Sequence, residues 1–127
     1  MAATADQMRN AVHAYVDGIN GRSLDGIVNI FAEDASVEDP VGSVPVRGRA
    51  AITDFYRAAL DLDLTLSLQG PIRLAAGHAA FPFQIAMAWR GEPVTIDVID
   101  IFTFDDAGKV TSMKAIFSRN NRKGRGK

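Results

Sequence analysis

The chain has 127 residues, of which 47% are hydrophobic and 23% charged, a composition typical of one globular domain. It contains no cysteine, which excludes disulfide bonds and thiolate metal sites. No apolar segment approaches the roughly 20 residues of a membrane span, and residues 1–10 lack the apolar part of a signal peptide, so we expect a soluble, cytoplasmic protein.

Charge is unevenly distributed along the chain. The net charge is −1, but residues 119–127 contain five of the 14 basic residues and no acidic one, so residues 1–118 carry nine basic and 15 acidic side chains, or −6. No aromatic side chains alternate with the basic ones, and we therefore interpret residues 119–127 as a flexible, solvated tail with no nucleic-acid or membrane partner. Residues 1–118 are predicted to form a single domain.

The first half of the chain has the periodicity of amphipathic helices. A first helix is predicted to end at Asn20-Gly21 and to bury Met8, Val12, Tyr15 and Ile19. A second helix, capped by Ser23, is predicted to bury Leu24, Ile27, Val28 and Phe31. Residues 33–48, rich in proline and glycine, are expected to form a loop or short hairpin. A third helix over residues 49–60 is predicted to bury Ile52, Phe55, Tyr56 and Leu60.

After residue 61 the apolar period changes to two, which is typical of strands. The alternating segments predict one buried face over residues 61–68 with Leu62, Leu64, Leu66 and Leu68, and another over 81–89 with Phe81, Phe83, Ile85, Met87 and Trp89. Two more strands are predicted over 93–104 and 110–117. Helices precede strands and the connections have hairpin length, so the fold class is α+β with a curved antiparallel sheet. Three helices on its concave face would enclose an apolar pocket.

The segment TIDVIDIFTF, residues 95–104, contains two aspartates that strand alternation separates. Asp97 falls on a mixed face with access to water or a neighbouring chain. Asp100 shares its face with Ile96, Val98, Phe102 and Phe104. A carboxylate in such surroundings usually takes up a proton and becomes a hydrogen-bond donor. The pattern alone leaves two alternatives open: a functional neutral acid, or a structural one satisfied by a buried backbone group.

Two further residues favour the functional alternative. Tyr15 lies on the buried stripe of the first helix, so its hydroxyl needs a polar partner. A phenol and a protonated carboxyl in one apolar pocket are two neutral donors that can bind one oxygen, as in an oxyanion hole. Asp39 precedes Pro40 in the segment SVEDPVG, where its side chain can reach the mouth of a cavity, although most acidic loop residues are simply solvated.

Three segments resemble one family: YVDGINGRSLDGIVNIFAEDASVEDPVGS at 15–43, FYRAAL at 55–60 and VIDIFTFDDAGKV at 98–110. Over residues 8–120 the chain resembles the bacterial 3-oxo-Δ5-steroid isomerases, or ketosteroid isomerases. The resemblance implies the conical α+β fold shared with nuclear transport factor 2, a steroid substrate, a homodimer packed through sheet faces, and no cofactor. In this family an apolar site keeps one aspartate protonated at neutral pH.

The resemblance also implies roles for individual residues. Tyr15 and Asp100 match the oxyanion-hole donors and Asp39 matches the general base. Tyr56 matches a pocket tyrosine, while Phe31 stands where some members carry another tyrosine, which implies a shorter hydrogen-bond network behind Tyr15. The apolar positions implied to line the substrate pocket, besides Phe31, are Phe55, Met87, Val98 and Phe117.

Other functions are possible on the same fold. An epoxide hydrolase of this type would hold water with an arginine between two aspartates, and the candidates Arg73 and Arg90 flank turns instead. A polyketide cyclase would use a different acid–base set. A non-catalytic carrier of hydrophobic ligands, or a dimerisation module, would not need Asp39. His13 and His78 lie on a helix surface and in a turn, which does not predict a metal site or a catalytic triad.

Overall fold

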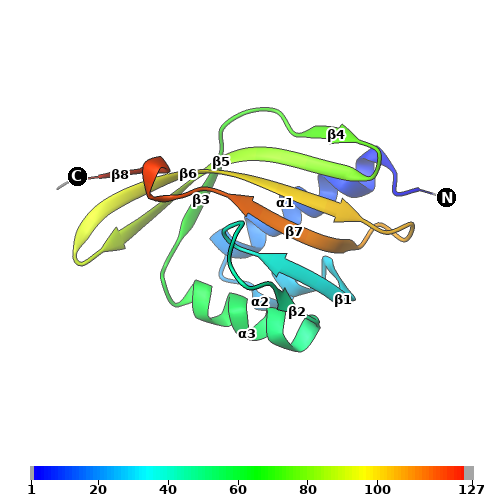
Figure 1. Ribbon diagram of the computed structural model, residues 1–127, viewed down its shortest axis with the longest axis horizontal. Helices are drawn as coiled ribbons and strands as arrows, with labels where there is room; N and C mark the ends of the chain where they lie inside the picture. The colour runs from blue at the N-terminus through cyan, green and yellow to red at the C-terminus, as the bar shows by residue number, and fades with distance from the viewer. Residues whose placement is uncertain (1, 125–127) are drawn as a thin grey trace.

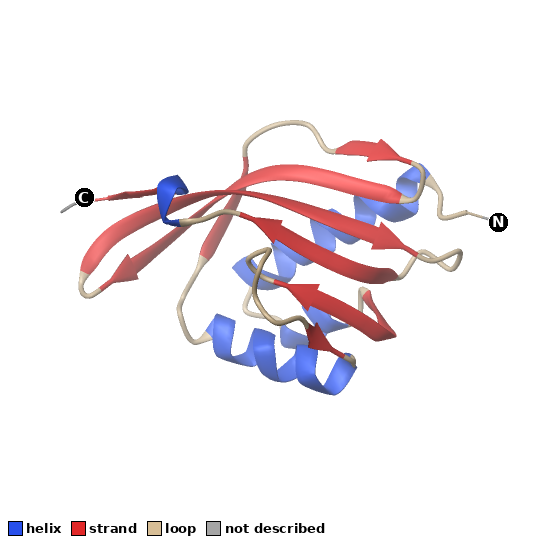
Figure 2. Cartoon of the chain, viewed as in Figure 1, coloured by secondary structure: helices blue, strands red, loops and turns tan. Residues whose placement is uncertain are grey.

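The computed structural model describes residues 2–124, in which helices lie against one side of a curved sheet (Figure 1). The helices are α1 (Ala5–Asn20), α2 (Leu24–Val28) and α3 (Arg49–Leu60). In Figure 2 they are on the same side of the sheet, and the long β5–β6 hairpin extends beyond them. The predicted arrangement of three helices on a sheet with a concave face is therefore confirmed.

Helix α1 forms for the reasons visible in its sequence. Thr4 and Gln7 make a reciprocal capping box at its start, in which the Thr4 hydroxyl accepts from the Gln7 N–H at 3.0 Å. The predicted stripe is buried, with exposures of 6% or less for Met8, Val12, Tyr15 and Ile19. A Cβ on Gly18 would lie 2.9 Å from an Ile27 side-chain carbon, so glycine permits the close approach of α2.

The sheet joins strands from the whole chain in the order β2-β1-β7-β6-β5-β3, with β4 also paired to β5 and β8 to β6. The strands are β1 (Phe31–Glu38), β2 (Val46–Arg47), β3 (Thr65–Leu68), β4 (Arg73–Ala75), β5 (His78–Trp89), β6 (Glu92–Phe104), β7 (Val110–Ile116) and β8 (Arg122–Gly124). All pairs are antiparallel except β1 with β7. The sheet is thus mostly antiparallel, as the hairpin-length connections predicted, with one parallel pair that they did not predict.

Strand β1 is the main element that the sequence did not predict. Phe31 was assigned to the second helix, yet that helix ends at Val28 and Phe31 begins β1, fully buried opposite Val110. The spacing of Phe31 from the preceding apolar residues fits a helix, but its backbone pairs with β7 instead. Tertiary contacts therefore override the local helix propensity at this position. The expected short hairpin does form at the end of β1, where Val37 pairs with Val46.

Two predicted inward residues are exposed. Leu62 lies in the turn after α3, before β3 begins, and is 53% exposed. Trp89 ends β5 at the hairpin tip and is 47% exposed, with the Arg90 guanidinium 5.7 Å from its ring centre. Alternation along the strands is correct, but these residues lie beyond the part of the sheet that the helices cover.

The part of the basic tail within residues 2–124 has regular structure. Residues 119–121 form a 3₁₀ turn (η1), and 122–124 form β8, which pairs with β6 residues 94–96. Residues 125–127 of the predicted flexible tail lie outside the described residues. Lys123 makes an ion pair with Asp97 at 3.0 Å.

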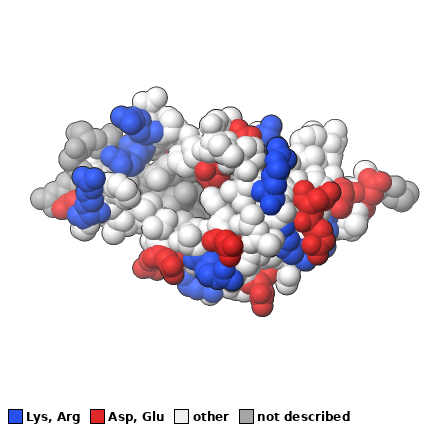
Figure 3. Space-filling model, turned by 60° about the horizontal axis from the view of Figure 1, so that its bottom comes forward, with Lys and Arg blue, Asp and Glu red and all other residues white. Residues whose placement is uncertain are grey.

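None of the helices within residues 2–124 is long and apolar enough to cross a membrane. The space-filling view presents a face on which acidic and basic side chains are interspersed (Figure 3).

Candidate active site

An apolar pocket lies between α1, α3 and the inner face of the sheet. Its polar lining residues come from four elements: Tyr15 from α1, Asp39 from the end of β1, Tyr56 from α3 and Asp100 from β6. The remaining lining residues are apolar: Ile19, Ala59, Leu64, Leu66, Phe83, Ile85, Val98, Ala115 and Phe117. Segments up to 85 residues apart in the sequence thus bring three predicted catalytic residues, Tyr15, Asp39 and Asp100, to one cavity.

Asp100 is the most unusual of these groups. It is 1% exposed, and neither of its carboxyl oxygens has a hydrogen-bond partner among residues 2–124. Its neighbours in the sheet are Phe81 on β5 and Ala115 on β7, which offer no polar side chain. Burial, and secondarily the negative charge of Asp39, raise the pKa of Asp100 well above its ordinary value. This shift favours the neutral carboxyl, which, unlike a carboxylate, can donate a hydrogen bond.

Tyr15 is buried by aromatic rings and bonded to Tyr56. The Tyr56 hydroxyl donates to the Tyr15 oxygen at 3.1 Å, which leaves the Tyr15 proton available to another acceptor. Phe102 packs edge-to-face on Tyr15 with ring centres 5.3 Å apart. The pKa of Tyr15 is raised by burial first, and then by Tyr56, Asp100 and Asp39. Tyr15 thus keeps its proton at pH 7, and it lines the same pocket as Asp100.

The turn that follows β1 holds Asp39 in place. The Val41 N–H donates to the Ala115 carbonyl at 2.8 Å, and the Gly42 N–H donates to the Glu38 carboxylate at 2.8 Å. Burial raises the pKa of Asp39 to about 6. Asp39 is therefore mostly ionised at pH 7. A pKa this close to neutral pH allows a group both to accept and to release a proton, as an acid–base catalyst must. One pocket thus holds two carboxyl groups that burial affects to different degrees, since the pKa of Asp39 rises to about 6 and that of the more deeply buried Asp100 is also raised well above its ordinary value.

The predicted substrate-lining residues are only partly placed at the pocket. Tyr56, Val98 and Phe117 line it, whereas Phe31, Phe55 and Met87 do not. Phe31 lies behind Tyr56, with ring centres 5.9 Å apart and planes tilted by 30°. Phe55 packs edge-to-face on Tyr56 at 5.0 Å. Met87 is paired with Val94 towards the hairpin tip. Phe31 and Phe55 thus pack against Tyr56, and Met87 lies further along β5, so contact of these three residues with a substrate stays a prediction.

Seven lining residues were not among the predicted site residues. Five of them, Ile19, Leu64, Leu66, Phe83 and Ile85, lie on faces that the periodicity had marked as buried, so the signal was present but did not distinguish pocket from core. Ala59 and Ala115 had no such signal. Their small side chains leave space instead of filling it, which only the assembled fold reveals.

The side chains weighed for other chemistry lie outside the pocket. Arg73 donates to the Pro71 carbonyl at 3.0 Å and Arg90 lies over Trp89 at the hairpin tip. His13 is exposed on α1, and the His78 ring contacts the Ala76 carbonyl at 2.8 Å. Among residues 2–124 no arginine or histidine lines the pocket, and no group of three or more histidine, aspartate or glutamate side chains could hold a metal ion.

Comparison with known proteins shows the family of the chain. The SnoaL-like domain family matches residues 12–113, most of the chain. The chain belongs to this SnoaL-like family. This SnoaL-like protein is 39% identical over 112 residues to the steroid Δ-isomerase of Nocardioides simplex, covering 88% of this chain and 90% of that protein. The resemblance to steroid isomerases is therefore confirmed.

A solved structure supports the same fold for this SnoaL-like chain. The epoxide hydrolase/cyclase-like enzyme SalBIII, described for its role in pyran ring formation in the polyether salinomycin, matches with a TM-score of 0.86 and 25% identity, covering 94% of this chain and 96% of that one. The predicted nuclear transport factor 2-like α+β fold is confirmed.

Proposed function

We propose that this SnoaL-like protein is a steroid Δ-isomerase that converts 3-oxo-Δ5-steroids into 3-oxo-Δ4-steroids. The observation that carries this proposal is the buried carboxyl of Asp100, which has no hydrogen-bond partner within residues 2–124 and lines the same apolar pocket as Tyr15 and Asp39. The 39% identity to a steroid Δ-isomerase supports it independently.

In the proposed reaction Asp39 is the base. Its carboxylate removes a proton from C4 of the steroid, and the electrons move to the C3 oxygen to give a dienolate. Protonated Asp39 then returns the proton to C6, which shifts the double bond from the 5,6 to the 4,5 position. One carboxyl group serves for both transfers, so its pKa of about 6 suits it to accept and to release a proton near neutral pH.

Tyr15 and Asp100 stabilise the dienolate in this proposal. Both are neutral donors in a pocket with apolar walls, where hydrogen bonds to a negative oxygen are stronger than in water. Loss of one such donor typically costs about 2.7–4 kcal/mol, or roughly 10²–10³ in rate. Apolar contact with the pocket walls would contribute to steroid binding at about 25 cal/mol per Å² of buried surface.

An assay of the conjugated product tests this function. Purified protein is incubated with 5-androstene-3,17-dione, and the ultraviolet absorbance of the enone is followed. We expect turnover by the natural protein, loss of turnover in Asp39→Asn with steroid binding retained, and normal turnover in Asp34→Asn, which alters an exposed carboxylate on β1, the strand that leads to Asp39. A hydrophobic-ligand carrier would bind steroid with no turnover in any of the three, and that result would reject the proposal.

The epoxide hydrolase alternative receives less support from the pocket. Its chemistry calls for an arginine that orients water between two aspartates, and no arginine lines this pocket within residues 2–124.

A homodimer packed through the outer face of the sheet is the second part of the proposal. Ile99 and Ile116 are register partners on β6 and β7, and they are 46% and 45% exposed. Pro82 on β5 pairs with Ile99 and extends the same apolar row. Exposed apolar rows of this kind on a sheet favour contact with an identical surface. Sedimentation should give a dimer for the natural chain and a monomer for Ile99→Lys; a natural monomer would reject this part.

A further inference from the structure

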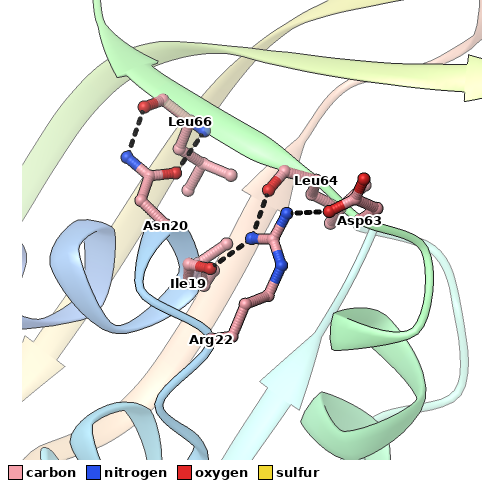
Figure 4. A network of polar contacts seen from close by, with 6 residues as sticks. All are labelled: Ile19, Asn20, Arg22, Asp63, Leu64 and Leu66. Carbon is pink, nitrogen blue, oxygen red and sulfur yellow. Dashed lines mark hydrogen bonds and ion pairs between the residues drawn. The ribbon is translucent and has the colours of Figure 1, made fainter.

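The end of α1 is joined to β3 by a compact set of polar contacts, drawn in Figure 4. Asn20 makes two of them, because its side-chain amide donates to the Leu66 carbonyl at 2.9 Å and its oxygen accepts from the Leu66 N–H at 2.8 Å. Asn20 thus binds both backbone groups of one residue, as a neighbouring strand would. Strand β3 is at the end of the sheet order and has β5 as its only strand neighbour among residues 2–124.

Arg22 makes the remaining contacts. One guanidinium nitrogen donates to two carbonyls, those of Ile19 on α1 and Leu64 before β3, each at 2.7 Å. A second nitrogen of the same group binds the Asp63 carboxylate. We call Asn20 and Arg22, with these bonds, the α1–β3 clip. The clip bonds main-chain atoms and so fixes the path of the chain.

The clip holds one wall of the pocket without lining it. Ile19, Leu64 and Leu66, whose backbone groups it binds, all have side chains in the pocket lining, whereas Asn20 and Arg22 do not. The side chains of Leu64 and Leu66 point inward while their main chain faces the clip. A shift of β3 away from α1 would therefore open this wall directly.

The two joined elements differ in how much they depend on the clip. Helix α1 is anchored by a row of buried side chains, including Val12 and Tyr15 at 0% and 3% exposure. Strand β3 has four residues, of which only Leu66 is buried. Loss of the clip should therefore displace β3 and leave Tyr15 in place.

We infer that Asn20 and Arg22 are positioning residues that hold the β3 wall and set the affinity for the apolar body of the substrate, separately from the proton transfer. This inference rests on the proposed isomerase function. The catalytic groups Tyr15, Asp39 and Asp100 receive no bond from the clip, so loosening it should raise KM and leave kcat nearly unchanged.

Conservative variants test the clip with small risk to folding. Asn20→Asp removes the donor to the Leu66 carbonyl and sets a carboxylate oxygen against it. Arg22→Lys keeps the charge and the same left-handed backbone, φ 58°, but a single ammonium cannot reproduce the guanidinium's bonds to two carbonyls and a carboxylate together. We expect each to raise KM about three- to tenfold, the effect of one or two lost hydrogen bonds, with kcat within about twofold.

Two controls separate the carbonyl bonds from other effects. Asp63→Asn removes the ion pair but keeps the Arg22 bonds to both carbonyls, and we expect nearly natural KM. Arg57→Ala removes an exposed pair with Asp54 at 2.6 Å on α3, away from the clip, and should also be nearly natural. Thermal melting establishes that each variant is folded at the assay temperature.

The outcomes are distinguishable. A fall in kcat at constant KM in Asn20→Asp and Arg22→Lys would show that the clip aligns the catalytic groups, and would overturn the inference. The inference would also be overturned if Asn20→Asp and Arg22→Lys both had the KM of the natural protein, or if Asp63→Asn raised KM as much as they do. The dissociation constant of the 3-oxo-Δ4-steroid product, measured by calorimetry, should increase in parallel with KM. If the natural protein binds steroid but shows no turnover, the isomerase proposal is rejected, and the dissociation constant of the steroid still tests the clip. If it shows neither binding nor turnover, both the isomerase proposal and the inference about the clip are overturned.

Discussion

The two faces of β6 place chemically identical side chains in opposite environments. Asp100 is buried on the inner face without a hydrogen-bond partner among residues 2–124, and burial raises its pKa. Asp97, three residues earlier on the outer face, accepts from Gln84 at 3.1 Å and pairs with Lys123 at 3.0 Å. The hydrogen bond from Lys123 is the main cause that lowers the pKa of Asp97.

This contrast indicates how the fold prepares a site. Strand alternation selects the face, and the layer that covers that face decides the protonation state. The helices and Tyr15 cover Asp100, whereas β8 supplies a cation to Asp97. A donor for the proposed oxyanion is thus made by excluding water and cations from one side of a strand, with no need for an unusual residue type.

The largest expected difference between the two faces is in catalysis. Asp100→Leu removes an oxyanion donor and should lower kcat by roughly 10²–10³, whereas Asp97→Asn should change it less than about twofold. The enone assay measures both under the same conditions. Equal losses would mean that the inner and outer faces were assigned wrongly.

The pH dependence tests the second inner carboxyl. Asp39 must be ionised to act as base, so kcat/KM should be constant well above the Asp39 pKa of about 6 and fall about tenfold per pH unit below it. A pH–rate profile of the natural protein gives this value directly. A profile that stays flat down to pH 4.5 would contradict the assignment of Asp39 as the buried base.

Protonation of Asp100 can be observed without turnover. Because burial raises its pKa, carbon-13 magnetic resonance of labelled aspartate should find its carboxyl protonated at pH 7, while the Asp97 signal is that of a carboxylate. Assignment by Asp100→Leu and Asp97→Asn identifies the two signals. An ionised Asp100 in the free protein would remove the basis of the oxyanion hole.

A smaller effect is expected behind Tyr15. Tyr56→Phe removes the hydroxyl that donates to Tyr15 at 3.1 Å but keeps the ring packed on Phe31 and Phe55. We expect kcat to fall by less than about tenfold, because Tyr15 keeps its own proton for the substrate and loses only a supporting bond. A loss as large as that of Asp100→Leu would show that Tyr56 itself binds the oxyanion.

The smallest expected effect is on stability at the outer face. The pKa of Asp97 is lower in the folded protein than in the unfolded chain, so its contribution is present above the unfolded value and is lost as pH falls through the folded one. Asp97→Asn should be slightly less stable than the natural protein at pH 7, and the difference should be smaller at pH 3. Urea unfolding at both pH values measures this, and Lys123→Ala should reproduce the result at pH 7.

The sequence predicted well where the information is local. The 3.6-residue spacing of Met8, Val12 and Tyr15 predicted α1 and its buried face, and the period of two predicted which aspartate of β6 faces inward. Phe31 was wrongly assigned to the second helix. Its spacing from Leu24, Ile27 and Val28 is helical, and this spacing does not reveal that the chain leaves the helix and that Phe31 pairs with Val110. Phe55 and Met87 were proposed as substrate-lining residues from a family resemblance, which gives positions in the chain but not the direction of a side chain, and their contact with substrate stays a prediction.

The sequence by itself determined the α+β class, the helix stripes and the separation of Asp97 from Asp100, because these depend on neighbours a few residues away. Only the tertiary structure decided that Tyr15, Asp39 and Asp100 share a cavity, that Phe31 supports Tyr56 from behind, and that Asn20 binds the edge of β3. These features depend on contacts between distant segments and on the exclusion of water. Burial changes the pKa of a carboxyl only after the layers that bury it have assembled.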